Sequence, residues 1–349
     1  MTEVDDQMML CGVCATPGTF RLEPRPLPQV APDGWVLVDV LAIGLCGTDY
    51  HIYEGKHPFL EYPRVIGHEL SAVVAASAGG WMVGQLVVVN PYISCGACRA
   101  CRRGKPNCCS NIAVLGVHRD GGMCARIAVP AGNLYAADGL TPLQAAMVEF
   151  LAIGAHAVRR SEMAAGDRVL VTGAGPIGLG AALFARLTGA EVHLLDASPA
   201  RLAQAHDLFG FEQIHDDGSE ILQGDLADGF DVVFDATGNA AAIHAGFAHV
   251  AHGGTYVLIS VVKGDITFTD SEFHKREMRL IGSRNAVELD FRTVMAALRS
   301  GQIDSAKLAS EVLSLDALPG RFDALVHSRD GLIKAIVEMP RATQGARHD

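Results

Sequence analysis

The sequence predicts an α/β protein with two domains, a β-barrel domain followed by a doubly wound parallel sheet. The chain has 349 residues, which is enough for about two domains because a typical domain has roughly 100–200 residues. From about residue 10 to 135, short apolar or alternating runs lie between Gly and Pro residues, as in antiparallel strands. From about residue 153, such runs alternate with apolar segments of helix length, as in a parallel sheet covered by helices.

The first part of the chain is expected to supply the antiparallel barrel. Its clearest strands are predicted at residues 35–41, 70–76 and 86–90. In the second part, strands are predicted at 168–172, 191–195, 212–215, 231–234, 254–260 and 279–282, with helices at 177–187 and 199–210. Two more helices are predicted at 291–299 and 330–338, and we expect them to return to the first domain. The predicted domains are therefore residues 1–152 together with 290–349, and residues 153–289.

Composition and charge exclude several classes of protein. Hydrophobic residues make up 49% of the chain and charged residues 19%, which excludes a disordered chain. The formal net charge of −11 argues against a nucleic-acid partner. The acidic N-terminus is unlike a secretory signal, and the uncharged stretch 169–185 is too short and too rich in Gly for a membrane span. We therefore expect a cytoplasmic protein that does not enter a membrane.

A glycine-rich loop predicts a dinucleotide site. The predicted strand 168–172 is followed by Gly173-Ala174-Gly175-Pro176-Ile177-Gly178 and a helix. In this pattern the first Gly allows a tight turn, the second admits a pyrophosphate and the third lets helix and strand pack closely. Asp196 follows 21 residues after Gly175 and would bind the adenosine ribose, which favours NAD over NADP. Arg201 is near enough to modify that preference, although its helix is expected to turn it to solvent; a structural glycine turn with an incidental aspartate is the alternative.

A cluster of cysteines predicts a structural zinc lobe at residues 93–112. Two residues separate Cys95 from Cys98 and Cys98 from Cys101, and either Cys108 or Cys109 completes a set of four. Four thiolates bind one zinc ion in closed structural sites. An iron–sulfur cluster is an alternative, but its usual motif continues with Pro and not with Ser. Disulfides are the other alternative, disfavoured without an export signal.

A second set of residues predicts a catalytic zinc site. Cys46, His68 and either Glu69 or Glu149 form a mixed donor set that leaves one zinc position open. Taken singly, a His or a buried Cys is more often a core residue than a metal ligand. The remaining candidates receive structural interpretations. Those candidates are the pair Cys11 and Cys14, Cys124, His156 and the solvated His244, His249 and His252; His118 is as compatible with the cleft as with a surface loop.

Four motifs in a fixed order carry a resemblance to a known family. They are Gly44-Leu45-Cys46-Gly47-Thr48-Asp49, Pro63-Arg64-Val65-Ile66-Gly67-His68-Glu69, the four-cysteine lobe and the glycine-rich loop. Over nearly its whole length the chain resembles the zinc-dependent medium-chain dehydrogenase/reductase family, in the branch of the sorbitol and threonine dehydrogenases. Within that branch, residues 115–122 look most like bacterial sugar-acid (hexonate) oxidoreductases.

The resemblance implies a GroES-like catalytic domain, a Rossmann domain and an active-site cleft between them. It implies that Cys46 and His68 bind a catalytic zinc ion. Glu69 is then a direct or nearby ligand, and Glu149 a carboxylate that binds zinc or exchanges with water. The family's proton relay matches two residues of the first motif, Thr48 and His51.

The resemblance also assigns the second zinc ion and the coenzyme. Aligned on residues 104–107, Cys109 and not Cys108 is the fourth ligand of the structural zinc. The residues that fall where the family lines the cofactor cleft are Thr237, Ser260, Ser283 and Arg284. Three departures from the family pattern, at Phe150, at 71–72 and at 83–86, remove no ligand and put only the shape of the substrate site in doubt.

The predicted activity is the reversible oxidation of a secondary alcohol of a small polyol or sugar acid by NAD, with two zinc ions per chain. The substrate oxygen would enter the open zinc position and its proton would leave through Thr48 and His51. The alternatives are a non-catalytic NAD-binding sensor or structural relative and a zinc-free, NADP-linked reductase of the same superfamily. The family's branch further implies a homodimer or homotetramer.

Overall fold

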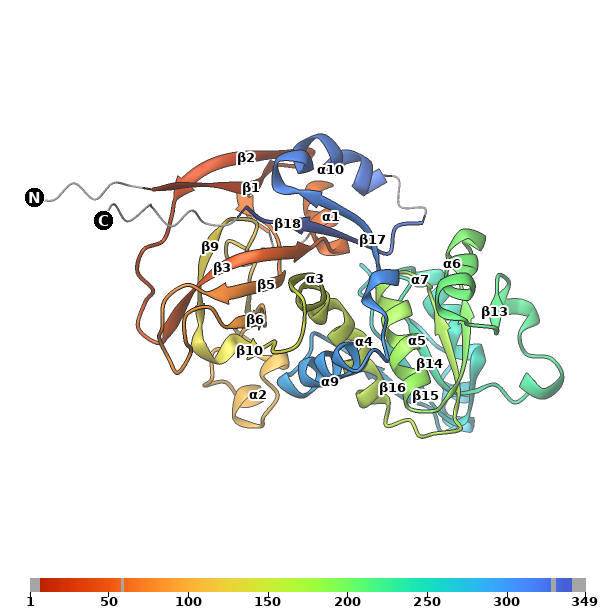
Figure 1. Ribbon diagram of the computed structural model, residues 1–349. Helices are drawn as coiled ribbons and strands as arrows, with labels where there is room; N and C mark the ends of the chain where they lie inside the picture. Colours follow the sequence, from red (N-terminus) through yellow and green to blue (C-terminus); the bar gives the residue numbers. More distant parts are fainter. Residues whose placement is uncertain (1–6, 58–59, 328–330, 341–349) are drawn as a thin grey trace, which may run out of the picture. The chain divides into compact units, whose positions relative to one another are not determined.

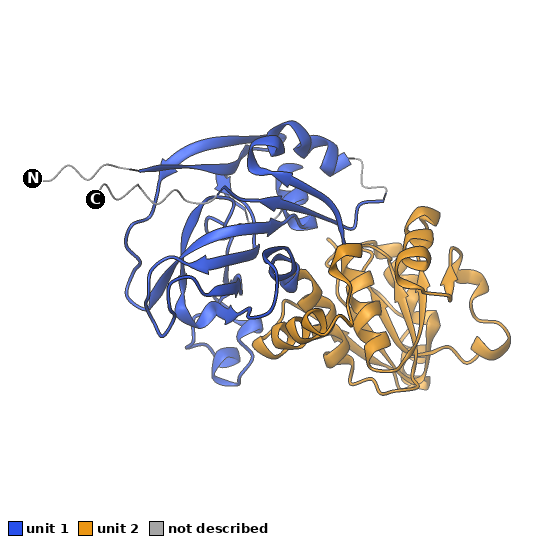
Figure 2. Cartoon of the chain, viewed as in Figure 1, with its two compact units in different colours: residues 1–149, 308–349 blue, residues 150–307 orange. Residues whose placement is uncertain are grey.

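The computed structural model describes residues 7–57, 60–327 and 331–340. The chain divides into two compact units, shown in different colours in Figure 2: unit 1 holds residues 1–149 and 308–349, and unit 2 holds residues 150–307. None of the helices within the described ranges is long and apolar enough to cross a membrane.

Unit 1 is built mainly from antiparallel strands (Figure 1). Its strands are β1 (Met8–Thr16), β2 (Thr19–Pro26), β3 (Trp35–Gly44), β4 (Arg64–Val65), β5 (Glu69–Val74), β6 (Leu86–Val89), β7 (Tyr92–Ile93), β8 (Ala113–Val114), β9 (Arg126–Pro130), β10 (Leu134–Ala136), β17 (Ala309–Ser314) and β18 (Lys334–Glu338). One sheet has the order β2-β1-β4, and a seven-stranded sheet has the order β10-β6-β5-β3-β18-β17 with β9 also paired to β3. The strands predicted at 35–41, 70–76 and 86–90 are confirmed as β3, β5 and β6.

Short helices and an apolar core complete unit 1. The helices are α1 (Gly47–Tyr53), α2 (Arg99–Arg102), α3 (Pro142–Ala146), the first residues of α4 (Val148–Ser161), and α10 (Leu318–His327). Val36, Val38 and Val40 alternate along β3 and all are buried in the core. Phe322 of α10 stacks on Phe20 of β2 with ring centroids 4.4 Å apart, which fixes the late helix to the earliest hairpin.

The predicted helix at 330–338 is wrong. Residue 330 lies outside the described residues, and 334–338 form strand β18, which is antiparallel to β3 and parallel to β17. All of β18 except its last residue is buried. A strand covered on both faces lacks the alternation that reveals a strand, so its apolar run can be mistaken for a helix.

Unit 2 is a six-stranded parallel sheet with helices, as predicted. Its strands are β11 (Arg168–Thr172), β12 (Glu191–Leu195), β13 (Ile214–His215), β14 (Phe230–Asp235), β15 (Val250–Leu258) and β16 (Arg279–Gly282). Its helices are the rest of α4, α5 (Pro176–Leu187), α6 (Pro199–Phe209), α7 (Ala240–Gly246), α8 (Asp270–Lys275) and α9 (Glu288–Arg299). The strand order β13-β12-β11-β14-β15-β16 reverses between β11 and β14. Nucleotides bind at the carboxyl ends of strands at such a reversal.

Residues 290–307 lie in unit 2 and not, as the sequence suggested, with the first domain. The reason is a buried polar cluster between α4 and α9. Asp290 at the start of α9 contacts His156 Nδ1 at 2.7 Å and accepts from Arg159 Nε at 2.6 Å, both on α4. The interpretation of His156 as a buried, hydrogen-bonded residue is confirmed by this contact, and Asp290 is the partner that keeps α9 in unit 2.

Candidate active site

The glycine-rich loop of unit 2 joins β11 to α5. Gly173 has φ +95, and a Cβ on Gly178 would overlap the carbonyl oxygen of Gly173, so both positions require Gly. Gly175 is the N-cap of α5, and Pro176 and Ile177 open the helix. Among the described residues, and apart from its chain neighbours, no atom lies within 4 Å of where a Cβ on Gly175 would be. The loop therefore leaves room beside a helix N-terminus, whose free N–H groups suit a phosphate.

Asp196 is hydrogen-bonded to this loop. Its Oδ2 accepts from the Ala174 amide at 2.7 Å and its Oδ1 from the Ser198 amide at 2.8 Å. Arg201 is exposed to solvent, as expected, over 41% of its side chain, and its Nη1 also lies 3.5 Å from Asp196 Oδ2. The carboxylate at the end of β12 is thus fixed by the backbone and partly neutralised by an arginine from the next helix.

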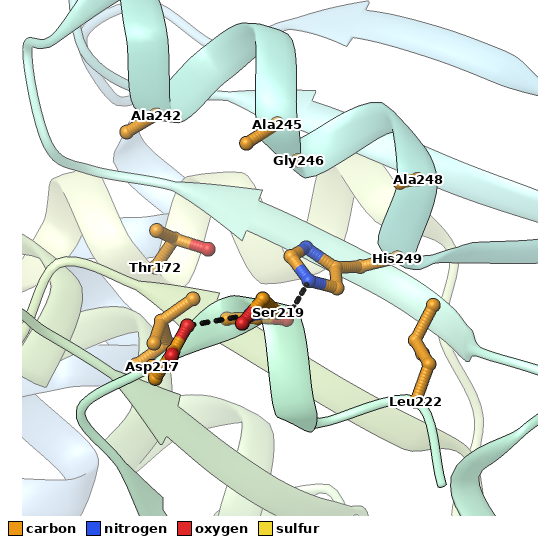
Figure 3. A pocket seen from close by; sticks show the side chains of 11 residues that line it. Thr172, Asp217, Ser219, Leu222, Ala242, Ala245, Gly246, Ala248 and His249 are labelled. Atoms are coloured by element: carbon orange, nitrogen blue, oxygen red, sulfur yellow. Dashed lines mark hydrogen bonds between the residues drawn. The ribbon is translucent and has the colours of Figure 1, made fainter.

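A cavity of about 470 Å³ opens at the carboxyl ends of β11 and β12 (Figure 3). Thr172 and Leu195 line it from the sheet, and an alanine-rich face of α7 lies opposite. His249 also lines the cavity, with its Nε2 2.9 Å from the Gly218 carbonyl oxygen. His249 is only 6% exposed, so its interpretation as a solvated histidine is wrong. The mostly apolar walls suit a flat ring better than a charged group.

Three of the other predicted coenzyme residues lie at the carboxyl ends of neighbouring strands. Thr237 Oγ1 and Ser260 Oγ both donate to Asp235, the last residue of β14, at 3.0 and 2.8 Å. Ser283 follows β16 and is buried, and its Oγ has no hydrogen-bond partner among the described residues. Arg284 is exposed. Burial raises the pKa of Asp235, although the two hydroxyl groups counteract this. Asp235 thus holds the Thr237 and Ser260 side chains at the end of β14.

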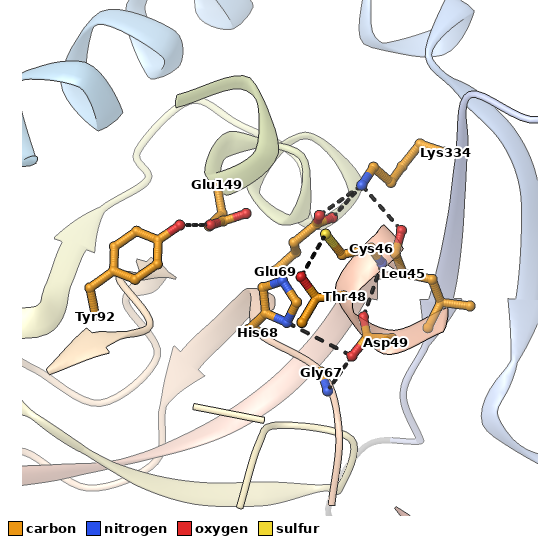
Figure 4. A network of polar contacts seen from close by, with 10 residues as sticks. All are labelled: Leu45, Cys46, Thr48, Asp49, Gly67, His68, Glu69, Tyr92, Glu149 and Lys334. Carbon is orange, nitrogen blue, oxygen red and sulfur yellow. Dashed lines mark hydrogen bonds and ion pairs between the residues drawn. The ribbon is translucent and has the colours of Figure 1, made fainter. Parts of the chain in front are cut away.

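The mixed donor set of unit 1 comes together in a buried network (Figure 4). One ligand atom from each of Cys46, His68 and Glu69 lies within 4.8 Å of the other two. Cys46 is the N-cap of α1 and Glu69 opens β5, so the site joins a helix start to a strand start. Gly44, opposite Glu69 in the sheet, leaves the space that the Glu69 side chain fills. Thiolate, imidazole and carboxylate are the donors that zinc takes in sites with an open position, so these residues fit the ion.

Asp49 holds the two ligand segments in place. It accepts from the amide of Cys46 at 2.9 Å and from the amide of Gly67 at 3.2 Å. His68 Nδ1 lies 3.8 Å from Asp49 Oδ1 and makes no hydrogen bond to the described residues. An acid beside one ring nitrogen leaves the other nitrogen to bind a metal. Burial raises the pKa of Asp49.

Glu69 is paired with a buried lysine that the sequence did not single out. Lys334 Nζ, on β18, lies 2.7 and 2.8 Å from the two Glu69 oxygens and donates to the Leu45 carbonyl at 3.1 Å. The lysine and glutamate side chains are 2% and 0% exposed. Burial alone would lower the pKa of Lys334, but the Glu69 charge raises it. The ammonium group therefore stays charged and occupies both oxygens of Glu69.

Glu149 has a different partner. At the start of α4, it accepts a short hydrogen bond from the Tyr92 hydroxyl, and both side chains are buried. Among the described residues, Glu149 forms no ion pair within 4.0 Å, but the charges of His68 and Lys334 act on it from farther away and lower its pKa. Burial raises the pKa of Glu149 to about 7. Glu149 is also not among the three residues with closely grouped donor atoms. It is a buried carboxyl group next to the donor set, and its side-chain partner is the Tyr92 hydroxyl.

The two predicted relay residues lie on α1. Thr48 Oγ1 accepts from Cys46 Sγ at 3.8 Å, which places the hydroxyl beside the donor set (Figure 4). His51 is exposed in the last turn of the same helix. The link between Thr48 and His51 stays a prediction.

The four-cysteine lobe of unit 1 forms a second donor group. Ligand atoms of Cys95, Cys98, Cys101 and Cys109 lie within 4.8 Å of one another. Cys108 is exposed and is not in this group. Backbone amides donate to three of the sulfur atoms at 3.3–3.5 Å. Hydrogen bonds from Cys101 and Ser110 lower the pKa of Cys98 to about 5. Amide donors favour thiolates, the form that binds zinc.

Comparison with known proteins agrees with both units. The alcohol dehydrogenase GroES-like domain family matches residues 32–139, and the zinc-binding dehydrogenase family matches residues 176–300. The L-galactonate-5-dehydrogenase of Escherichia coli is 38% identical over 334 residues, 93% of this chain and 97% of that protein. The 2-dehydro-3-deoxy-L-galactonate 5-dehydrogenase of Pseudoalteromonas atlantica is 33% identical over 88% of this chain and 93% of that one.

A solved structure shows the same fold. The RspB alcohol dehydrogenase from Escherichia coli, in complex with NADH, has a TM-score of 0.88 and 28% identity and covers 95% of this chain and 99% of its own. The predicted fold class and family resemblance are confirmed by these matches. Unit 1 contains the GroES-like domain and unit 2 the dinucleotide-binding sheet. The chain belongs to the zinc-dependent medium-chain dehydrogenase/reductase family and is a dehydrogenase.

Proposed function

We propose that this dehydrogenase oxidises a secondary alcohol of a small polyol or sugar acid with NAD, and that it uses one catalytic and one structural zinc ion. The observation that carries the proposal is the grouping of Cys46, His68 and Glu69 donor atoms in a chain that also has the glycine-rich loop. The relatives named above act on galactonate derivatives, which supports a sugar-acid substrate.

The catalytic zinc would be held by Cys46 and His68 with a carboxylate as third ligand, and we propose Glu149 for that role. Glu69 lies nearer to the other donors, but Lys334 already occupies both of its oxygens. Among the described residues Glu149 has no direct ion pair, and a buried carboxylate without one is costly, so Glu149 would gain more from a metal than Glu69. Glu69 would then keep its ion pair with Lys334 and support the site without binding the metal. Zinc supplies a Lewis acid that lowers the pKa of a bound alcohol.

The chain's own residues would move the proton and orient the ligands. The Thr48 hydroxyl next to Cys46 would accept the alcohol proton and pass it to His51, which is exposed and can release it to water. Asp49 keeps His68 in the orientation that leaves its second ring nitrogen for the metal. In the lobe, the four thiolates of Cys95, Cys98, Cys101 and Cys109 would hold the structural ion.

The coenzyme would bind to unit 2 with its pyrophosphate at the glycine-rich loop. The fixed carboxylate of Asp196 would accept the ribose hydroxyl groups and repel a 2′-phosphate, so we propose NAD. Arg201 reduces that repulsion because it lies near the carboxylate. The mostly apolar cavity at the ends of β11 and β12 would take the adenine ring. Ser283, with its unpaired hydroxyl, would meet the nicotinamide half together with Thr237, Ser260 and Arg284.

We also propose a cytoplasmic homodimer or homotetramer. β16 is an edge strand of the unit 2 sheet, and Leu280 on it is 39% exposed. An unpaired edge with an exposed apolar side chain favours pairing with a second copy. Light scattering of the wild type and of Leu280→Lys tests this: the variant should fall to a smaller species, and an unchanged mass would contradict pairing through β16.

One screen tests the proposed activity. NAD reduction is measured over sugar alcohols, hexonates including L-galactonate, and amino alcohols, with the metal content of the same sample. We expect turnover on a hexonate or polyol at about two zinc ions per chain. Cys46→Ser should retain NAD binding and lose turnover. NAD binding without turnover on any compound would favour a sensor, and full activity of Cys46→Ser would refute the proposed role of zinc.

A further inference from the structure

Two buried cysteines that are far apart in the sequence lie opposite each other in unit 1. Cys11 is on β1, and Cys124 lies just before β9. The two residues form an antiparallel bridge and are 1% and 3% exposed. Neither belongs to the two groups of possible metal donors found among the described residues. The interpretation of these cysteines as core residues holds, and the sequence alone did not indicate that Cys11 lies opposite Cys124.

The backbone around this bridge has the geometry of a cross-strand disulfide site. The Gly12 amide donates to the Met123 carbonyl at 2.7 Å, next to the cysteine pair, and the Cys124 amide donates to Gly122 at 2.7 Å. Cys124 therefore gives its amide proton to its own segment and not to Cys11. In such non-hydrogen-bonded pairs the Cα atoms are ~4.5 Å apart and the side chains are close. A disulfide needs Cα atoms ~4.4–6.8 Å apart, so the bond can form with little movement.

The two thiols have different electrostatic surroundings. The pKa of Cys11 is lowered, chiefly by its interaction with the neighbouring Cys124 thiol, and the Arg25 charge adds to this effect. The pKa of Cys124 is raised well above its usual value by the same hydrogen bond and by burial. The lowered pKa favours Cys11 as the thiol that reacts first, and Cys124 is placed to complete a disulfide with it.

We propose that Cys11 and Cys124 form a reversible disulfide when the protein meets a small oxidant such as hydrogen peroxide. The Cys11 thiolate attacks one peroxide oxygen, the O–O bond breaks and hydroxide leaves, which gives a sulfenic acid. The Cys124 thiol then attacks that sulfur, the S–O bond breaks and water leaves. Both sulfur atoms are oxidised, and one peroxide is reduced to two waters in total. A dithiol reductant restores the two thiols by exchange.

The bond would tie β1 to the segment that supports the catalytic donor set. The amides of Gly121, Gly122 and Met123 donate to the carbonyls of residues 65–67 at 2.7–2.9 Å, immediately before His68. The disulfide would also close a long loop, which restricts the unfolded chain and so favours the folded one. The oxidised protein should therefore unfold at a higher temperature than the reduced protein.

Peptide mapping of the whole, zinc-loaded protein tests this proposal. The protein is treated with hydrogen peroxide, its free thiols are alkylated, and it is digested without reductant. We expect one peptide pair joined through Cys11 and Cys124, two hydrogen atoms lighter than the separate peptides and released by dithiothreitol. Recovery of Cys11 and Cys124 as alkylated thiols, or their linkage to other cysteines, would overturn the proposal.

The thermal midpoint gives an independent reading with a matched control. Oxidation should raise the midpoint of the wild type and leave that of Cys124→Ala unchanged. Cys14→Ala is the control, because Cys14 is equally buried on β1 but lies opposite Phe20 and Arg64. This variant should keep both the cross-linked peptide and the rise in midpoint. A rise that persists in Cys124→Ala would contradict the assignment, and the wild-type peptide map decides even where a variant fails to fold.

Discussion

Replacing Glu149 by glutamine should stabilise the zinc-free protein at alkaline pH. Burial raises the pKa of this carboxyl group from 4.5 to about 7, so the folded chain holds a proton that the unfolded chain releases. A group with a raised folded pKa stabilises the fold fully below the unfolded value, and that contribution is lost as the pH rises through the folded value. For this difference in pKa the loss is ~3 kcal/mol between about pH 4.5 and pH 8.

The assay is urea unfolding of wild type and Glu149→Gln, both kept free of zinc by a chelator, at about pH 5 and pH 8. The glutamine stays neutral, so the variant should gain up to ~3 kcal/mol over the wild type at pH 8 and little at pH 5. An equal difference at the two pH values, or destabilisation at pH 8, would refute the reasoning.

Glu69→Gln is the matched control because it changes the neighbouring buried carboxylate in the same way. In this variant Lys334 loses the negative charge of Glu69, and removing one partner of a buried ion pair lowers the free energy of unfolding by ~3–5 kcal/mol. The two variants should thus shift stability in opposite directions at pH 8. When zinc is restored, Glu149→Gln should gain less stability from the metal than Glu69→Gln, since bound ligand stabilises in proportion to its affinity.

Three further changes test other parts of the account. Lys334→Met should lower stability by ~3–5 kcal/mol in urea unfolding, because Glu69 is left buried and unpaired, and an unchanged midpoint would contradict the pairing. Gly178→Ala should weaken NAD binding in calorimetry and lower the free energy of unfolding by ~1–3 kcal/mol or more, because its Cβ would overlap the Gly173 carbonyl. An affinity equal to that of the wild type would show that the loop accommodates the methyl group without cost. Asp196→Ala should shift the ratio of kcat/KM for NADP over NAD upward by roughly 10- to 100-fold, the value of a charge-assisted hydrogen bond, and an unmoved ratio would exclude Asp196 from coenzyme choice.

Local patterns were enough to predict the glycine-rich loop and both cysteine-containing motifs. The glycines at 173 and 178 are required by φ and by close packing, so they leave a signature in a few residues. The lobe ligands are also close in sequence, although spacing alone left Cys108 and Cys109 undecided. The structure groups Cys109 with the other three because its sulfur accepts the Cys95 amide.

What the sequence could not predict depends on contacts between distant segments. Lys334 and Glu69 are 265 residues apart, and the lysine lies on a strand that resembles a helix in sequence because both of its faces are buried. Nothing in the sequence around Tyr92 indicates its role, because its contact with Glu149 exists only in the folded chain. The placement of α9 in unit 2 depends on Asp290, whose partners on α4 no local pattern reveals.

The central claim is that Cys46 and His68 hold a zinc ion, and a crystal structure with anomalous data at the zinc edge tests it directly. The account predicts two anomalous peaks per chain, one among the four lobe cysteines and one bonded to Cys46 Sγ and a His68 ring nitrogen, with a Glu149 oxygen as a further ligand. A single peak in the lobe, in a preparation that still oxidises its alcohol substrate at full rate, would contradict the account.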